Sequence, residues 1–193
     1  MFTHHCGNTQ QSHQFIKTRE HNPTPKTTDQ KLVFAKIYAH LDTNGLITDR
    51  QSGYRPHHGT QTQLIYLTDT LYKALDNNMD LTTIYLDISR YFDKIWHVGL
   101  LAKCKYQCGI RGNLLKWLES YLENRTHSVT LNTATSSIKT INAGCPQGSV
   151  LGPLLALIYL NDLDGITNNN LLFFADDTLL FKSHPHHSNE ATT

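Results

Sequence analysis

The stretch Leu171-Leu172-Phe173-Phe174-Ala175-Asp176-Asp177-Thr178-Leu179-Leu180-Phe181 places two adjacent carboxylates between two short apolar runs. Apolar runs of this length are typical of short buried strands, and the break at residues 175–177 predicts a tight hairpin with the acids at its tip. Two like charges side by side repel each other, and a hard divalent cation bound through carboxylate oxygens would relieve that repulsion. The hairpin tip is therefore a candidate metal site.

The acidic pair also has a simpler interpretation. Aspartates in turns commonly accept hydrogen bonds from their own backbone, and Asp176 and Asp177 could do only that. A third acid bears on the choice, because Asp87 lies in another apolar stretch that predicts a strand over residues 82–89.

In that strand, period-two alternation directs one set of side chains to the core, namely Ile84, Leu86 and Ile88. Asp87 then lies on the opposite face. If this strand lies beside the hairpin, Asp87, Asp176 and Asp177 converge. Three carboxylates can hold two Mg²⁺ ions about 4 Å apart for an in-line displacement at phosphorus.

Four segments, in order along the chain, resemble the reverse transcriptase of LINE-type, non-LTR retrotransposons. Three of them are YLDISRYFDKIWH at residues 85–97, AGCPQGSVLGPLL at 143–155 and FADDT at 174–178. Upstream, QSGYRPHHGT at 51–60 resembles a fingers motif of the same family. The likeness covers residues 28–182.

This resemblance implies an α+β fold, a right-hand polymerase palm with an antiparallel sheet and packed helices, with partial fingers and no thumb. It implies extension of a DNA primer along an RNA template from deoxynucleoside triphosphates. The cofactors would be two Mg²⁺ ions, or Mn²⁺ in their place. Asp87 and Asp176 would bridge the ions, and Asp177 would help to hold the site.

The resemblance also suggests nucleotide-binding residues. Phe92 matches an aromatic residue that lies under the incoming sugar, where a ring excludes a ribose 2′-hydroxyl and so selects deoxynucleotides; from the residues alone, Phe92 could be plain core. Gln147 and Gly148 are implied to contact the incoming nucleotide or the templating pair, and Arg55 the template or the triphosphate. Tyr91 departs from the family pattern, which usually has a small residue where the backbone approaches the triphosphate.

Length and composition agree with a soluble domain, because 193 residues with 39% hydrophobic residues suffice for one core. The four cysteines show no CxxC spacing and no secretory leader precedes them, which predicts reduced thiols, three of them buried: Cys104, Cys108 and Cys145. No apolar run approaches the roughly 20 residues that span a bilayer. We expect an intracellular protein, cytoplasmic or nuclear, with no membrane partner.

A net charge of +1 is low for a nucleic-acid-binding protein, but the charges are unevenly distributed. Residues 103–125 contain five Lys or Arg against two Glu, whereas residues 144–181 contain four Asp and no Lys or Arg. An acidic floor for metals beside a basic wall for phosphates fits a polymerase palm. Ordinary solvated helix faces would give the same basic stretch.

Three segments are expected along the chain. Residues 1–27 are polar without apolar periodicity and predict a disordered or foreign leader, residues 28–182 a fingers and palm fragment, and residues 183–193 an unstructured polar tail. Helices are predicted near residues 29–41, 64–75, 100–108, 114–122 and 150–160, and a β-hairpin over 128–141. The apolar stripe of the second helix is expected to pack against the sheet: Leu64, Leu67, Leu71 and Leu75.

Alternatives to an active polymerase stay open. The lack of an endonuclease and of the first fingers motif, and a chain end 16 residues after Asp177, favour an inactive transposon remnant. A nucleic-acid-binding module with the palm fold but no turnover is another alternative, which metal-dependent primer extension would distinguish. Phe92 argues against an RNA-templated RNA polymerase. The oligomeric state does not follow from the sequence.

Overall fold

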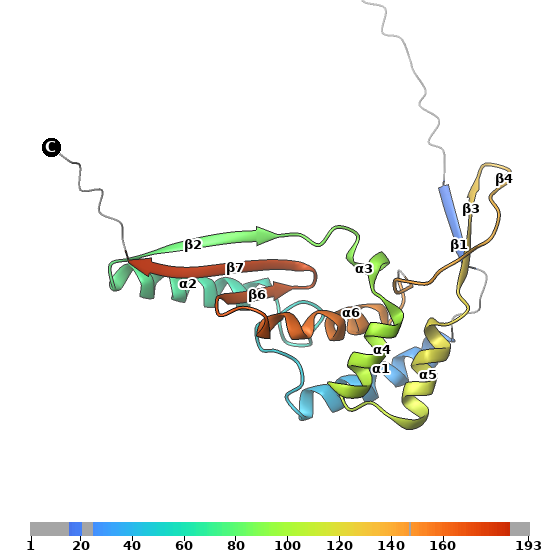
Figure 1. Cartoon of the computed structure of the whole chain (residues 1–193), viewed down its shortest axis with the longest axis horizontal. Coiled ribbons are helices and arrows are strands. Elements are labelled where there is room, and N and C mark those ends of the chain that lie inside the picture. The colour runs from blue at the N-terminus through green and yellow to red at the C-terminus, as the bar shows by residue number, and fades with distance from the viewer. Residues whose placement is uncertain (1–15, 21–24, 147, 186–193) are drawn as a thin grey trace, which may run out of the picture. The chain divides into compact units, whose positions relative to one another are not determined.

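The computed structural model describes residues 16–20, 25–146 and 148–185. Helices and strands are mixed, and the strands pair antiparallel in two separate sheets, as Figure 1 shows. The chain divides into two compact units, one formed by the N-terminal segment with residues 124–141 and the other by residues 24–123 with 142–193. The predicted combination of helices with antiparallel sheets is confirmed.

The smaller unit contains one sheet. Strand β3 (Thr126–Leu131) pairs with β1 (Ile16–Glu20), and also with the two short strands β4 (Ala134–Thr135) and β5 (Lys139–Thr140). The hairpin predicted over residues 128–141 is therefore present.

For residues 16–20, strand β1 corrects the disordered alternative of the leader predicted over residues 1–27, because Ile16–Glu20 forms a regular strand; the alternative of a foreign leader stays a prediction. Its backbone partner lies far downstream in β3, and local sequence periodicity cannot report such a partner. The remainder of that leader up to residue 15, together with residues 21–24, lies outside the described residues. The predicted polar tail begins inside strand β7, and its residues 186–193 also lie outside them.

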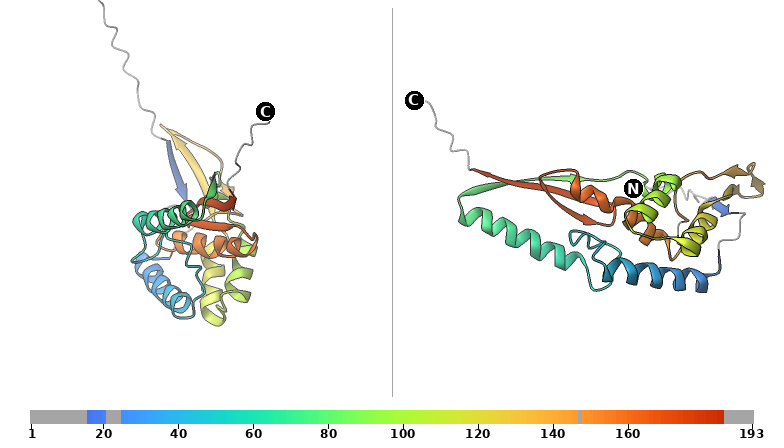
Figure 2. Two further views of the ribbon diagram at one scale, coloured as in Figure 1. Left: turned by 90° about the vertical axis from the view of Figure 1, so that its left-hand side faces the viewer. Right: turned by 60° about the horizontal axis from the view of Figure 1, so that its bottom comes forward.

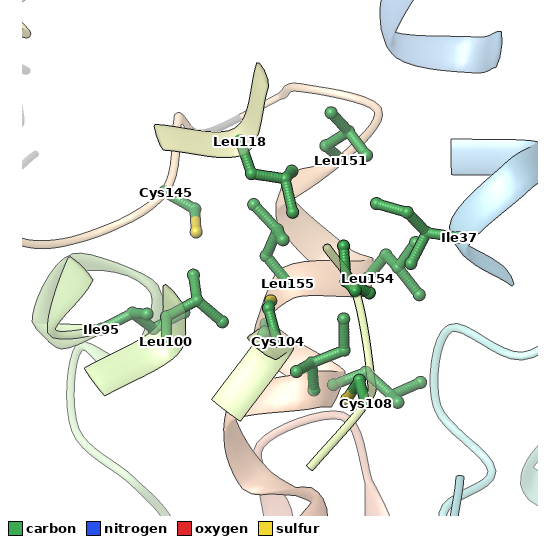
Figure 3. Packing of buried hydrophobic residues seen from close by; sticks show 14 of the residues in the cluster. Ile37, Ile95, Leu100, Cys104, Cys108, Leu118, Cys145, Leu151, Leu154 and Leu155 are labelled. Atoms are coloured by element: carbon green, nitrogen blue, oxygen red, sulfur yellow. The ribbon is translucent and has the colours of Figure 1, made fainter. Parts of the chain in front are cut away.

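The core of the larger unit is helical. Helices α1 (Thr27–Thr43), α4 (His97–Tyr106) and α5 (Gly112–Leu122) surround α6 (Gly152–Leu160), as Figures 1 and 3 show. Seven of the nine residues of α6 are buried, as expected for a helix that is apolar on all sides. Side chains that meet in this core include Ile37, Leu41, Leu100, Leu118, Leu151 and Leu155.

Three cysteines lie in the same core as free thiols, as predicted. Burial raises the pKa of Cys104 to about 12 and that of Cys108 to about 11, so both are protonated at neutral pH. The thiolate is the reactive form, so these side chains act as small apolar residues. Cys145 is buried beside them, and Cys6 lies outside the described residues.

The second sheet has the order β2–β7–β6 and carries the predicted acids. Strand β2 (Met79–Leu86) pairs with β7 (Asp177–Pro185), which turns back on β6 (Asn170–Phe174). The predicted hairpin and the strand leading to Asp87 are thus both confirmed. Helix α2 (Thr60–Asp76) runs along the strands, as Figure 2 shows.

The remaining helices are short. Helix α3 (Tyr91–Lys94) follows β2, and a 3₁₀ helix, η1 (Asn161–Gly165), continues from α6. No helix in the described ranges combines the length and the apolarity needed to cross a bilayer.

Two burial predictions for this sheet are wrong. Ile84 and Leu86, expected in the core, are each 48% exposed, and Leu64 of the α2 stripe is 60% exposed. Ala74 is the one residue of α2 that is buried. The physical reason is that a three-stranded sheet with a single helix beside it has too little cover to exclude water from its β2 edge. Ile88, the third predicted core residue, does pack against the helical core.

We expect Leu155→Ala in α6 to lower the free energy of unfolding by about 2–5 kcal/mol, because it leaves a cavity in a fully buried site. The matched change Leu64→Ala on α2 should cost less than about 0.5 kcal/mol, because that side chain is largely in solvent. Chemical denaturation followed by circular dichroism measures both. Equal losses would contradict the described core.

Candidate active site

The acids predicted to act together meet at one end of the β2–β7–β6 sheet. Leu86 pairs with Thr178 in the β2–β7 ladder, so continuing the register by one residue places Asp87 opposite Asp177. Phe174 pairs with Asp177 across the β6–β7 hairpin, which leaves Ala175 and Asp176 as its two-residue turn. The antiparallel ladder therefore brings together acids that lie about ninety residues apart in the chain.

Asp87 and Asp177 face a common space. Both line a cavity of about 520 Å³ between α2 and the sheet, whose other walls are mainly apolar side chains of α2 and of the three strands β2, β6 and β7. Both residues are exposed to solvent. Asp87 and Asp177 are therefore the two carboxylates of the predicted site that line the same cavity.

Asp176 acts on a different set of neighbours. Burial and then the charge of Asp176 raise the pKa of Tyr54 above its usual value. Burial is the largest cause of the raised pKa of Tyr91, followed by Cys145 and Tyr159, and the carboxylate of Asp176 adds to it after them. Asp176 is half-buried, whereas its neighbour Asp177 is exposed. Asp176 belongs to the turn and Asp177 begins β7, so the two carboxylates have different surroundings.

The expected single cluster of three carboxylates is not formed by the side chains. Within residues 16–20, 25–146 and 148–185, no three His, Cys, Asp or Glu side chains come together as a possible metal site. The donor chemistry nevertheless fits a hard divalent cation, because carboxylate oxygens are its preferred ligands. In the described part of the chain, the ion pairs formed by Lys and Arg involve other acids than these three. Their role as metal ligands stays a prediction.

Phe92 lies next to Tyr54 and Tyr91, the two tyrosines whose pKa Asp176 helps to raise. Its ring meets the ring of Tyr54 edge-on, with centroids 6.0 Å apart, and that of Tyr91 at 5.6 Å. Phe92 is half-buried and packs partly against the helical core. The structure thus places it near Asp176 through Tyr54, and both interpretations of Phe92, a sugar gate and a core residue, remain compatible with this position.

Tyr91 does not obstruct the surface beside Phe92. Its ring is buried, and its hydroxyl donates a hydrogen bond to the backbone carbonyl of Ala156 in α6. Burial raises the pKa of this phenol well above its usual value, so it stays a donor. The departure from the family pattern at residue 91 is accommodated in the core.

The Gly-Cys-Pro loop is tied to the segment that carries Phe92. The amide of Cys145 donates to the carbonyl of Phe92 at 2.9 Å, and the amide of Gly144 donates to that of Ile95 at 2.8 Å. Gly144 has φ +87°, and a Cβ there would lie 2.9 Å from the Phe92 carbonyl oxygen, so glycine is required at this close approach.

Gly148, farther along this loop, is exposed, with φ +75° and no atom within 4 Å of the place a Cβ would take. Its backbone is therefore open to a ligand. Gln147 lies outside the described residues, and the predicted nucleotide contacts of both residues stay predictions.

Arg55 has a structural role. Its guanidinium donates hydrogen bonds to the carbonyls of Thr48, at 2.9 Å, and Gln51, at 3.3 Å. Asp49 and Asp42 lie 3.8 Å and 4.0 Å from its nitrogens, and the side chain is largely buried. Contact with a template or a triphosphate stays a prediction, and it would require some of these bonds to be exchanged.

The sequence did not reveal that the segment around Gln51 joins the sheet. The amide of Ser52 donates to the carbonyl of Phe173, and the amide of Phe173 donates to that of Arg50, both at 2.9 Å. The pairing is a single parallel bridge between Gln51 and Phe173 of β6, and it does not continue as a ladder. The short polar stretch lacks the alternation of apolar and polar residues that predicts a strand. Its one distinctive residue is Gly53, and a glycine there predicts a turn instead of a contact with the sheet.

Comparison with known proteins agrees with the resemblance. A family described as "Reverse transcriptase (RNA-dependent DNA polymerase)" matches residues 23–193. The probable RNA-directed DNA polymerase from transposon X-element of Drosophila melanogaster is 34% identical over 134 residues, 69% of this chain and 14% of that protein. The RNA-directed DNA polymerase from mobile element jockey of Drosophila funebris is 35% identical over 156 residues, 77% of this chain and 17% of that protein. The chain spans less than a fifth of the length of these curated relatives.

We expect the pKa of Tyr54 to fall in Asp176→Asn but to stay above its usual value, because burial is the larger cause of the shift. Asp177→Asn is the matched control and should leave this pKa unchanged. NMR titration of ¹³C-labelled tyrosine, with Tyr54→Phe to assign the signal, measures the effect. A Tyr54 pKa that ignores Asp176 would contradict the geometry of the turn.

Proposed function

Since this chain belongs to the reverse transcriptase (RNA-dependent DNA polymerase) family, we propose that it is the palm and part of the fingers of a non-LTR retrotransposon reverse transcriptase. It would extend a DNA primer along an RNA template with deoxynucleoside triphosphates. The observation that carries this proposal is the β2–β7 register, which sets Asp87 opposite Asp177 with Asp176 in the adjoining turn.

In this proposal, the palm is the β2–β7–β6 sheet with helices α4, α5 and α6, and the fingers include α1 and α2. Asp87, Asp176 and Asp177 would hold two Mg²⁺ ions, or Mn²⁺ in their place. Bound ions of this kind activate the attacking hydroxyl and neutralise the charge that develops on the leaving pyrophosphate. The protein's own part is to present carboxylate oxygens at one end of the β2–β7 ladder.

The nucleotide would lie beside Phe92. Its ring and that of Tyr54 form an aromatic surface next to Asp176, and an aromatic surface can support a sugar while leaving no room or hydrogen-bond partner for a 2′-hydroxyl. Gly148, with its open backbone, and Gln147 in the same loop would contact the nucleotide or the templating pair. The hydrogen bond from Cys145 to Phe92 links the two parts of this surface.

Template binding should be weak in this chain. Of the predicted basic wall, Lys103 is engaged with Asp162 at 2.6 Å and with the carbonyl of Tyr159, and Arg125 is buried. Three exposed cations remain in that stretch: Lys105, Arg111 and Lys116. Because nucleic-acid affinity depends on how many phosphates a protein neutralises, few such contacts give weak and salt-sensitive binding.

We expect the purified chain to add deoxynucleotides to a DNA primer on a homopolymer RNA template in the presence of Mg²⁺, with short products that diminish as salt rises. Asp176→Asn should abolish extension, because it removes a carboxylate of the site. Asp69→Asn is the matched control, because Asp69 is exposed on α2 and pairs with Lys73 on the same helix. Template binding by a folded chain that shows no metal-dependent extension would favour a nucleic-acid-binding module or an inactive remnant.

If Phe92 selects the sugar, Phe92→Ala should raise ribonucleotide incorporation in this assay by about tenfold or more, while deoxynucleotide use stays within a few-fold. The reason is that an alanine leaves room for the 2′-hydroxyl. Competition between matched ribo- and deoxynucleoside triphosphates measures the ratio. A parallel fall for both nucleotides would show that Phe92 acts only in the core.

A further inference from the structure

We infer that Gln51 is a positioning residue whose side-chain amide holds the β6–β7 turn, and so fixes the carboxylates of Asp176 and Asp177 relative to the sheet. This inference deepens the proposed function and rests on it for the catalytic consequence. Its structural part concerns only the turn and can be measured without any activity.

The side-chain amide of Gln51 forms hydrogen bonds with both backbone groups of Ala175, the first residue of the turn. Its Oε1 accepts hydrogen bonds from the amides of Ala175, at 3.0 Å, and Gly53, at 2.7 Å. Its Nε2 donates to the carbonyl of Ala175 at 3.1 Å. Gln51 is only 3% exposed, so these bonds are shielded from competing water.

Ala175 has a conformation that needs such support. Its φ is +60°, in the left-handed region where a Cβ is unfavourable, and Asp176 after it is not in that region. In a two-residue hairpin turn with a positive φ at the first position, glycine is the usual residue. The β6–β7 ladder stops at the pair Phe174–Asp177 and leaves the backbone groups of Ala175 unused, and Gln51 satisfies them instead.

The backbone around Gln51 is held close to the turn. Its neighbours Arg50 and Ser52 bond to both backbone groups of Phe173 in β6, and Gln63 of α2 donates to the same Phe173 carbonyl. A Cβ at Gly53 would collide with the backbone nitrogen of Ala175, so the contact requires glycine. The turn is therefore held by hydrogen bonds from a segment about 120 residues upstream. We call the hydrogen bonds between the Gln51 side chain and Ala175 the clasp.

This clasp bears directly on the acids, because Asp176 and Asp177 follow Ala175 without an intervening residue. Catalytic groups must be held within about 0.5 Å of their productive position, and a misplacement of about 1 Å can lower a rate by about 100-fold. A turn with a left-handed alanine and no external bonds would have other conformations open to it. The hydrogen bonds of Gln51 restrict Ala175 to one conformation, directly before the two acids of the site.

Gln51→Met tests the inference by keeping the length and most of the volume of the side chain while removing its hydrogen bonds. Gln61→Met, on the exposed first turn of α2, is the matched control. In amide hydrogen exchange on the full chain, Gln51→Met should lower protection at Ala175 and its neighbours at least tenfold. Amides in α6 should keep wild-type rates, and Gln61→Met should change neither region.

Gln51→Glu separates a specific clasp from mere packing, and it keeps the test open if Gln51→Met does not fold. The protonated carboxyl of this variant offers an acceptor and a donor like those of the amide, and burial raises the pKa of a carboxyl. Protection of the turn, corrected for the intrinsic exchange rate, should be near wild type at about pH 5 and lost at about pH 9, where the carboxylate faces the Ala175 carbonyl. The wild-type chain should show no such pH step.

The outcomes decide between two separate claims. Unchanged protection at Ala175 in Gln51→Met, or an equal loss in the turn and in α6, would overturn the clasp. Absence of primer extension by the wild-type chain would count against the proposed function and leave the clasp standing on the exchange data. If Gln51→Met loosened the turn but still extended the primer at the wild-type rate, Gln51 would have no role in positioning the acids.

Discussion

The antiparallel pairing of β2 with β7 is the constraint on which the candidate site depends. It joins Met79–Leu86 to residues 178–185 and leaves about ninety residues between the acids at its end. Closing a loop of that length costs conformational entropy, which the buried contacts of the intervening helices must offset. Helix α6 and the residues packed around it supply those contacts, so the helical core and the acidic end of the sheet stabilise each other.

The two halves of the larger unit differ in how well they are covered. The helical core is closely packed, whereas β2 and α2 expose apolar side chains such as Ile84, Leu86 and Leu64. The site lies between these halves, with Phe92 joined to the core through Tyr91 and Cys145. Regions with more buried apolar contacts are locally more stable. We therefore expect Phe92, which packs against the core, to be held more firmly than the residues of the cavity between α2 and the sheet.

Local patterns predicted much of the fold and the identity of the acids. The apolar runs around Asp176 gave the hairpin, the alternation around Asp87 gave β2, and the helical stripes gave the core helices. The exposure of Ile84 and the pairing of strand β1 depend on distant parts of the chain, which no local pattern contains. The different exposure of Asp176 and Asp177 depends on the conformation of the turn, and the role of Gln51 depends on a parallel contact with β6. Such features follow from tertiary structure alone.

Disulfide trapping across β2 and β7 tests the register that brings Asp87 and Asp177 together. The double variant Asp87→Cys with Asp177→Cys should form an intramolecular disulfide under mild oxidation, because opposed residues of a ladder lie within the roughly 7 Å between Cα atoms that a disulfide allows. Asp87→Cys with Lys182→Cys is the control, since Lys182 pairs with Thr82, five residues and about 17 Å farther along the ladder. Mass spectrometry of the non-reduced protein should find the bridge in the first variant only; its absence there, or equal bridging in both, would contradict the register on which the site is built.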